Sequence, residues 1–121
     1  MSKIKVDVNG IGFTLDFDTM GHYELFEDAT GMDLMEMAGV QMGASMLAKI
    51  VKGLFYAGYI SECFINNEKP KYTKEELLRL GSIVDKKTGS QLVTDYFDMQ
   101  KEPEQPGEMN GQLEKELVLS K

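Results

Sequence analysis

The stretch Ile4-Lys-Val-Asp-Val-Asn9-Gly10-Ile-Gly-Phe-Thr-Leu-Asp-Phe17 decides the fold of the first part of this chain. Apolar and polar residues alternate on both sides of Asn9-Gly10, and a period of two is typical of half-buried strands. Asn-Gly is a preferred pair for a tight type I′ turn, in which both central residues need positive φ. Such a turn pairs apolar residues directly across the two strands: Val8 with Ile11, Val6 with Phe13, and Ile4 with Leu15. Residues 3–17 are therefore predicted to form a β-hairpin with one apolar face.

The residues that follow predict helices, which must cover this face because an isolated hairpin is only marginally stable in water. Thr19 is a candidate N-cap for a short helix that runs through Ala29. Gly31 stands where a left-handed residue would end that helix. Asp33 is a candidate cap for a second short segment over residues 34–38.

The longest predicted helix covers about residues 44–65 and is expected to be the central helix. Its apolar residues recur at spacings of three and four: Leu47, Ile50, Val51, Leu54 and Phe55. Gly53 and Gly58 lie inside this helix, where each costs up to about 1 kcal/mol relative to Ala. They indicate either close packing against a neighbouring element or a weak point.

Two capping boxes predict two further helices. Thr73-Lys-Glu-Glu76 precedes a predicted helix over residues 74–85. Thr88-Gly-Ser-Gln91 precedes a last helix that is expected to end near Gln100.

These elements predict a mainly α fold with an N-terminal β-hairpin, that is, a small helical domain of the α+β class. A chain of 121 residues with 42% apolar content is long enough for one packed core. Residues 1–101 are predicted to form this single globular domain. Residues 102–121 are rich in Glu, Pro and Gly and are predicted to be a flexible acidic C-terminal tail.

The net charge of −7 and the pI near 4.7 argue against nucleic acid or a membrane surface as a partner. No apolar run reaches the roughly 18–20 residues of a membrane span, and the first residues contain no signal-peptide core. The chain is therefore expected in the cytoplasm. Cys63, the single cysteine, fits a reducing compartment and is expected to be a small core residue.

Charge and methionine are both concentrated in the first half of the chain. Residues 7–48 contain eight acids and no Lys or Arg. Five of the nine methionines lie between Met32 and Met46. Flexible thioether side chains adapt to varied apolar partners, so four of them are predicted to contribute to a partner-binding surface: Met35, Met37, Met42 and Met46. The alternative is that they fill an irregular core.

The segment from Asp16 to Glu27 matches an EF-hand calcium loop at most ligand positions, with Gly21 at the turn. Met20 stands at one ligand position and offers no oxygen. A helix must also precede such a loop, whereas a strand is predicted here. The preferred interpretation is a strand that leads into a helix N-terminus, where acids are favourable. No metal and no cofactor are expected.

No catalytic constellation is recognisable in the sequence. His22 is the only histidine, and it is predicted to be a surface helix residue because no partner for acid–base chemistry can be assigned to it. The chain also has no Gly-rich phosphate loop and no His/Cys cluster. The protein is therefore expected not to be an enzyme.

Three segments, in this order, carry a resemblance to a known family. Tyr23-Glu-Leu-Phe-Glu-Asp-Ala-Thr-Gly31 follows the hairpin, Leu54-Phe-Tyr-Ala-Gly58 lies in the long helix, and Tyr72-Thr-Lys-Glu-Glu-Leu-Leu78 begins the next one. Over about residues 3–100 the chain resembles the tail assembly chaperones of long-tailed (siphovirus-type) phages and prophages. The shared features are patterns of size and polarity rather than a catalytic signature.

The resemblance implies a non-enzymatic chaperone that binds the helical tape measure protein and assists tail tube assembly in the host cytoplasm. It implies the tail tube protein as a second partner, a possible homo-oligomer, and absence from the mature virion. In many family members a programmed frameshift adds a C-terminal extension that recruits the tube subunit. Two other interpretations stay open, namely a small acidic EF-hand-like calcium-binding module and a structural subunit of a phage particle.

Overall fold

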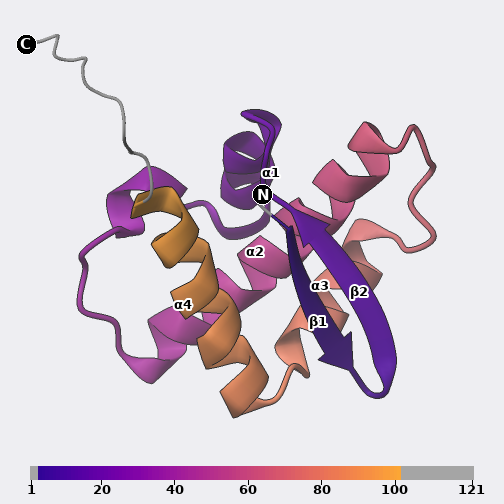
Figure 1. Ribbon diagram of the computed structural model, residues 1–121. Helices are drawn as coiled ribbons and strands as arrows, with labels where there is room; N and C mark the ends of the chain where they lie inside the picture. The colour runs from indigo at the N-terminus through magenta and orange to yellow at the C-terminus, as the bar shows by residue number, and fades with distance from the viewer. Residues whose placement is uncertain (1–2, 102–121) are drawn as a thin grey trace, which may run out of the picture.

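The computed structural model describes residues 3–101, a small domain of four α-helices and a two-stranded antiparallel sheet (Figure 1). The elements follow in the order β1 (Lys3–Val8), β2 (Ile11–Asp16), α1 (Gly21–Thr30), the 3-10 helix η1 (Leu34–Met37), α2 (Ala44–Ile65), α3 (Lys74–Ser82) and α4 (Lys86–Lys101). The predicted fold class, mainly α with an N-terminal β-hairpin, is confirmed. The tail predicted for residues 102–121 lies outside the described residues.

The hairpin has the register that its sequence predicts. Val8 pairs with Ile11, Val6 with Phe13 and Ile4 with Leu15. Asn9 and Gly10 have φ angles of 52° and 80°, as a type I′ turn requires. The paired apolar side chains are buried except that of Ile11, which is 49% exposed next to the turn.

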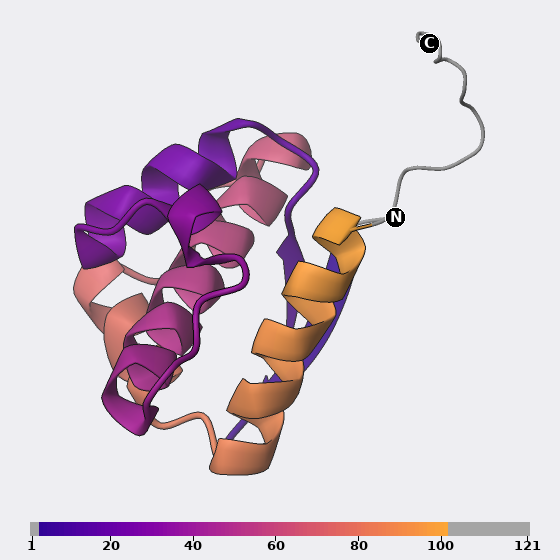
Figure 2. The ribbon, with the colours of Figure 1, turned by 90° about the vertical axis from the view of Figure 1, so that its left-hand side faces the viewer.

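Helix α2 is the centre of the domain, and it packs against α1, α3, α4 and β2 (Figures 1 and 2). The hairpin and α4 lie on one side of α2, while α1 and the segment that follows it lie on another (Figure 2). The predicted apolar stripe of α2 faces the core: Ile50, Val51, Leu54 and Phe55 are buried, and Leu47 is half-buried.

Gly53 and Gly58 lie where neighbouring elements pack closely against α2, as the first of the two interpretations predicts. A Cβ at Gly53 would lie 2.6 Å from the Phe26 ring and from Thr30 Cγ2 of α1. A Cβ at Gly58 would lie 2.6 Å from Leu15 Cβ of β2. Both contacts are shorter than real Cβ atoms tolerate. The two glycines therefore let α1 and the hairpin approach the backbone of α2.

The start of α1 corrects one capping prediction. The N-cap is Met20, without a side-chain cap, and the Thr19 hydroxyl instead lies 3.4 Å from Ser61 Oγ on α2. The end of α1 is as predicted, because Gly31 has φ 76° and its N–H donates to the Glu27 carbonyl at 2.7 Å.

The helices after residue 73 confirm one capping box and correct the other. Thr73 and Glu76 form a reciprocal capping box, although α3 ends at Ser82 rather than at 85. Helix α4 begins at Lys86, before Thr88. Asp85 precedes its first turn, with Oδ1 accepting a hydrogen bond from Thr88 N–H at 3.3 Å and the carbonyl accepting one from Gly89 N–H at 2.8 Å. Asp85 is therefore the N-cap, and Thr88 is the donor that it satisfies.

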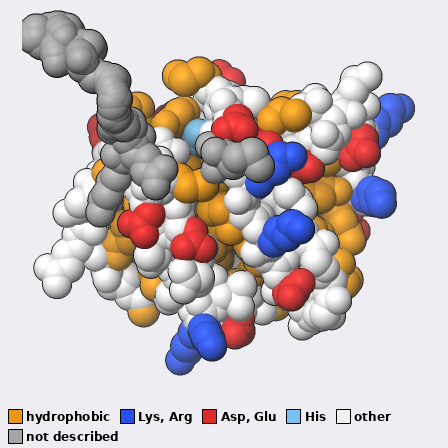
Figure 3. Space-filling model, in the orientation of Figure 1, with side chains coloured by type: hydrophobic (Ala, Val, Ile, Leu, Met, Phe, Trp, Pro, Cys, Tyr) orange, Lys and Arg blue, Asp and Glu red, His pale blue; other side chains and the backbone are white. Residues whose placement is uncertain are grey.

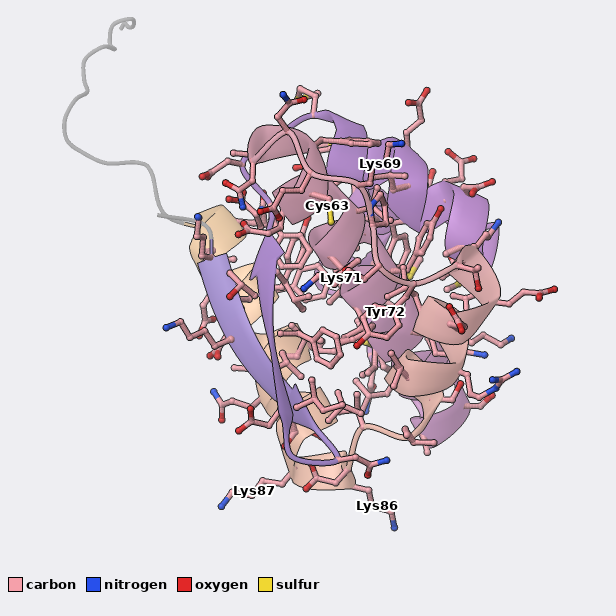
Figure 4. The ribbon with its side chains drawn as sticks, turned by 90° about the vertical axis from the view of Figure 1, so that its right-hand side faces the viewer. Cys63, Lys69, Lys71, Tyr72, Lys86 and Lys87 are labelled. Atoms are coloured by element: carbon pink, nitrogen blue, oxygen red, sulfur yellow. The ribbon has the colours of Figure 1, made fainter. Side chains whose placement is uncertain are left out.

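An aromatic cluster fixes the loop between α2 and α3 onto the hairpin. The rings of Phe13 and Tyr72 lie 5.8 Å apart, and both contact Tyr59. The Tyr59 hydroxyl also accepts a hydrogen bond from Lys71 N–H at 3.1 Å. Figure 4 shows Tyr72 between the hairpin and the central helix. This loop is therefore packed against the body rather than extended into solvent.

Candidate partner-binding surface

The methionine segment, residues 32–46, leads from the end of α1 into the first turn of α2. It contains η1, whose N-cap Asp33 accepts a hydrogen bond from Met35 N–H at 3.0 Å. Leu34 is buried and anchors the segment to the core. The segment therefore follows a defined path across the domain.

The four methionines predicted to bind a partner differ in accessibility. Met35 is 69% exposed, whereas Met37, Met42 and Met46 are half-buried and pack against the core. The core and surface interpretations therefore each describe part of the segment. Met35 offers the most surface to a partner.

Sequence reasoning missed a fifth methionine of this surface. Met20 is 80% exposed and, with Glu24 and Asp33, lines a shallow hollow beside the N-terminus of α1. Asp33 is two residues before Met35, so the exposed methionines flank the same acidic region. The sequence placed Met20 in a candidate calcium loop, and only the fold brings it next to the methionine segment.

The surroundings of these methionines are acidic. The exposed carboxylates nearby are those of Glu24, Glu27, Asp33 and Glu36. Among residues 3–101, ion pairs join Lys3 to Asp16 and Glu62, and Lys74 to Asp28, so none neutralises these four acids. On the face with α4 and the hairpin, by contrast, acidic and basic side chains are interspersed (Figure 3). The methionine surface therefore suits an apolar partner with basic flanks.

A second apolar feature is the α2–α3–α4 groove, which has a volume of about 490 Å³. It lies at the end of the domain where α2 and α4 begin, and Figures 1 and 2 show the starts of these two helices at the same end of the domain. Leu47, Val51 and Val84 form its apolar lining, and Lys52 and Lys86 lie on its rim. Residues 44, 47, 48, 51 and 52 share one face of α2, whereas Met46 aligns with Ile50 and Gly53 on the face toward α1. The groove and the methionine segment therefore flank the same half of α2.

His22 corrects the prediction of a surface helix residue, because it is only 1% exposed. Its Nδ1 lies 2.7 Å from the Thr19 carbonyl, and its Nε2 lies 2.7 Å from the Tyr96 hydroxyl on α4. The Phe17 ring packs against both the imidazole and the Tyr96 ring. His22 therefore links the start of α1 to α4 through the core.

These contacts fix the tautomer of the neutral imidazole. A carbonyl can only accept, so Nδ1 carries the proton and Nε2 accepts a hydrogen bond from the Tyr96 hydroxyl. Burial lowers the pKa of His22 despite the opposing effects of the Thr19 carbonyl and the nearby Asp16. Burial also raises the pKa of Tyr96. The pair is a neutral structural bridge whose two nitrogens are both occupied.

The candidate calcium loop does not have EF-hand geometry. Asp16 is the last residue of β2, so a strand precedes the loop where an EF-hand has a helix. Its side chain is buried, and Oδ1 accepts a hydrogen bond from Asp18 N–H at 2.8 Å. Within residues 3–101, no three His, Cys, Asp or Glu side chains are grouped as metal ligands would be. The strand-to-helix interpretation of this segment is confirmed.

Cys63 is buried, as predicted for a small core residue. Burial raises the pKa of its thiol, which disfavours the nucleophilic thiolate. Its place inside the end of α2 is visible in Figure 4.

No family model, curated protein or solved structure matches this chain. Within the part of the chain that the structure describes, no helix is both long enough and apolar enough to span a membrane.

Proposed function

We propose that this protein is a non-enzymatic tail assembly chaperone of a long-tailed phage or prophage. In this proposal it binds an apolar helical face of the tape measure protein through Met20 and the methionine segment. The observation that carries the proposal is the exposure of Met20 and Met35, 80% and 69%, on an acidic part of the surface. The resemblance to the chaperone family supplies the identity of the partner.

The chemistry of this surface suits a chaperone for a long helix. Methionine side chains are flexible and polarisable, so they adapt to successive apolar faces of different shape. Each methionine that becomes fully buried contributes up to about 1.5–3 kcal/mol to binding. The surrounding carboxylates stay hydrated at the rim and keep the complex soluble.

The non-enzymatic part of the proposal is supported by the side chains that catalysis would use. Both nitrogens of His22 are occupied by Thr19 and Tyr96, which leaves no lone pair or proton for a substrate. The Cys63 thiol is buried and its pKa is raised. Neither group is therefore presented to a substrate as an acid, a base or a nucleophile.

Co-expression with the tape measure protein tests this function. We expect the tape measure protein to be soluble and to co-purify with the wild-type chain, and to aggregate when expressed alone. An unrelated acidic protein of similar size controls for a general effect of charge. If the tape measure protein aggregates equally in all three cases, the proposal is wrong.

The wider part of the proposal concerns the assembly pathway. The tail tube protein would be a second partner, and the chaperone would form a homo-oligomer. The chaperone would leave before the virion is complete. Mass spectrometry of purified virions tests the last step. Stoichiometric amounts of this chain in virions would favour a structural subunit instead.

A further inference from the structure

We propose that the α2–α3–α4 groove binds the C-terminal segment of its own chain, residues 113–119. This inference goes beyond the proposed function, because it does not depend on the identity of an external partner. It adds an intramolecular interaction that covers an apolar surface of the domain.

The groove is apolar, preformed and uncovered by residues 3–101. Leu47 and Val84 are half-buried on its walls, and Ala48 on the rim is exposed. Its floor is set by a close contact, since a Cβ at Gly89 would lie 3.2 Å from Val51 Cγ2. The helices already touch there, so the groove cannot close by bringing α4 nearer to α2. Its volume of about 490 Å³ lies within the range of about 300–1,000 Å³ that is usual for ligand pockets.

The sequence beyond residue 101 contains one closely spaced apolar group. This group consists of Leu113, Leu117, Val118 and Leu119, with Glu114, Lys115 and Glu116 between its members. The first two leucines are four residues apart, a spacing that puts both on one face of a helical turn. An apolar segment of this length offers a complement to the lining of the groove.

The charges on the rim of the groove and in the C-terminal segment are also complementary. Two lysines and one acid, Lys52, Lys86 and Asp85, line the groove, and neither lysine forms an ion pair with a carboxylate of residues 3–101. Lys86 and Lys87 project from the body at this end of the domain (Figure 4). Glu114 and Glu116 flank Lys115, so the two acids outnumber the single base in this stretch and its net charge is opposite in sign to these lysines.

The segment can reach the groove from the end of α4. The groove includes Gly89, and α4 extends from there to Lys101, a distance of about 18 Å at ~1.5 Å per residue. Residues 102–112 can span up to about 36 Å when extended, at ~3.3 Å per residue. A tether of this kind gives an effective concentration in the millimolar range, so even a weak interaction keeps the groove occupied.

A single introduced tryptophan can test this proposal in the full chain, because the natural sequence contains none. We expect Leu117→Trp to fluoresce at shorter wavelength, and to be quenched less by acrylamide, than Met109→Trp in the intervening stretch. Adding Ala48→Glu to the Leu117→Trp variant, which places bulk and an acid on the rim of the groove, should shift the tryptophan emission to longer wavelength. Ser45→Glu adds the same charge on an exposed position of α2 outside the groove and should leave the emission unchanged.

Three outcomes would overturn the proposal. The first is a Leu117→Trp spectrum that matches Met109→Trp. The second is a blue-shifted spectrum that Ala48→Glu does not alter while circular dichroism shows the variant folded. The third is a blue shift that disappears on dilution, since the segment would then occupy a second copy rather than its own chain.

Discussion

At the scale of single residues, the His22–Tyr96 bridge is the feature that sequence reasoning could not find. The two residues are 74 positions apart, and each is unremarkable within its own helix. Their pairing exists only because Phe17, α1 and α4 meet in the core. Met20 is a similar case, since its role as an exposed neighbour of the methionine segment depends on where α1 begins.

The buried imidazole predicts that stability falls as the pH falls. The pKa of His22 is lowered in the folded state, so below about pH 6.5 the unfolded chain binds more protons than the native chain. Stability is then lost at up to about 1.4 kcal/mol per pH unit until the folded pKa is reached. Urea unfolding followed by circular dichroism at pH 7.5, 6.5 and 5.5 measures this loss.

The matched control is His22→Gln, which keeps a polar side chain and cannot titrate in this range. Its stability should be lower than that of the wild type at pH 7.5, and the difference should narrow toward pH 5.5. Parallel pH profiles for the two proteins would show that the imidazole does not have the lowered pKa.

At the scale of elements, the hairpin was predictable because its signals are local and agree. The turn pair Asn9-Gly10 and the alternating pattern specify the same register, so no distant contact is needed. The start of α4 was not predictable in the same way. Asp85 and Thr88 can each cap a helix, and the local sequence does not show that Asp85 accepts hydrogen bonds from Thr88 N–H and Gly89 N–H.

Substitution of the turn glycine tests the hairpin. Gly10→Val should destabilise the fold by about 1 kcal/mol or more, because a β-branched residue resists positive φ. A Cβ at this position would meet nothing within 4 Å, so the loss of stability would come from the strained backbone conformation and not from a steric clash. Asn9→Gly keeps positive φ accessible and should change the unfolding midpoint much less. Equal effects of the two changes would contradict the turn assignment.

The cap of α4 provides a test with an internal control. Asp85→Ala removes the side-chain acceptor of Thr88 N–H and should cost about 0.5–2 kcal/mol of stability. Thr88→Ala leaves that backbone donor in place and replaces Thr with a better helix former, so it should cost less. If Thr88→Ala lowered the free energy of unfolding in chemical denaturation more than Asp85→Ala does, α4 would begin at Thr88 instead.

At the scale of the whole molecule, two apolar surfaces, the methionine segment and the α2–α3–α4 groove, flank the first half of α2. The methionine segment could be predicted from composition, because five methionines and a run of acids without nearby Lys or Arg are visible in the sequence. The α2–α3–α4 groove could not, because residues from three helices form it. The composition also could not separate the exposed Met35 from its half-buried neighbours, since burial of Leu34 sets how the segment sits on the core.

The most direct test of the account is the affinity of the chaperone for its partner when the exposed methionines are removed. We predict that Met20→Ser with Met35→Ser weakens binding of the tape measure protein at least about tenfold, which corresponds to about 1.4 kcal/mol. Phe64→Ser removes a comparably exposed apolar side chain, 64% exposed at the far end of α2, and should leave the affinity unchanged. Unchanged binding by the double variant, or equal weakening by Phe64→Ser, would contradict the claim that Met20 and the methionine segment hold the partner.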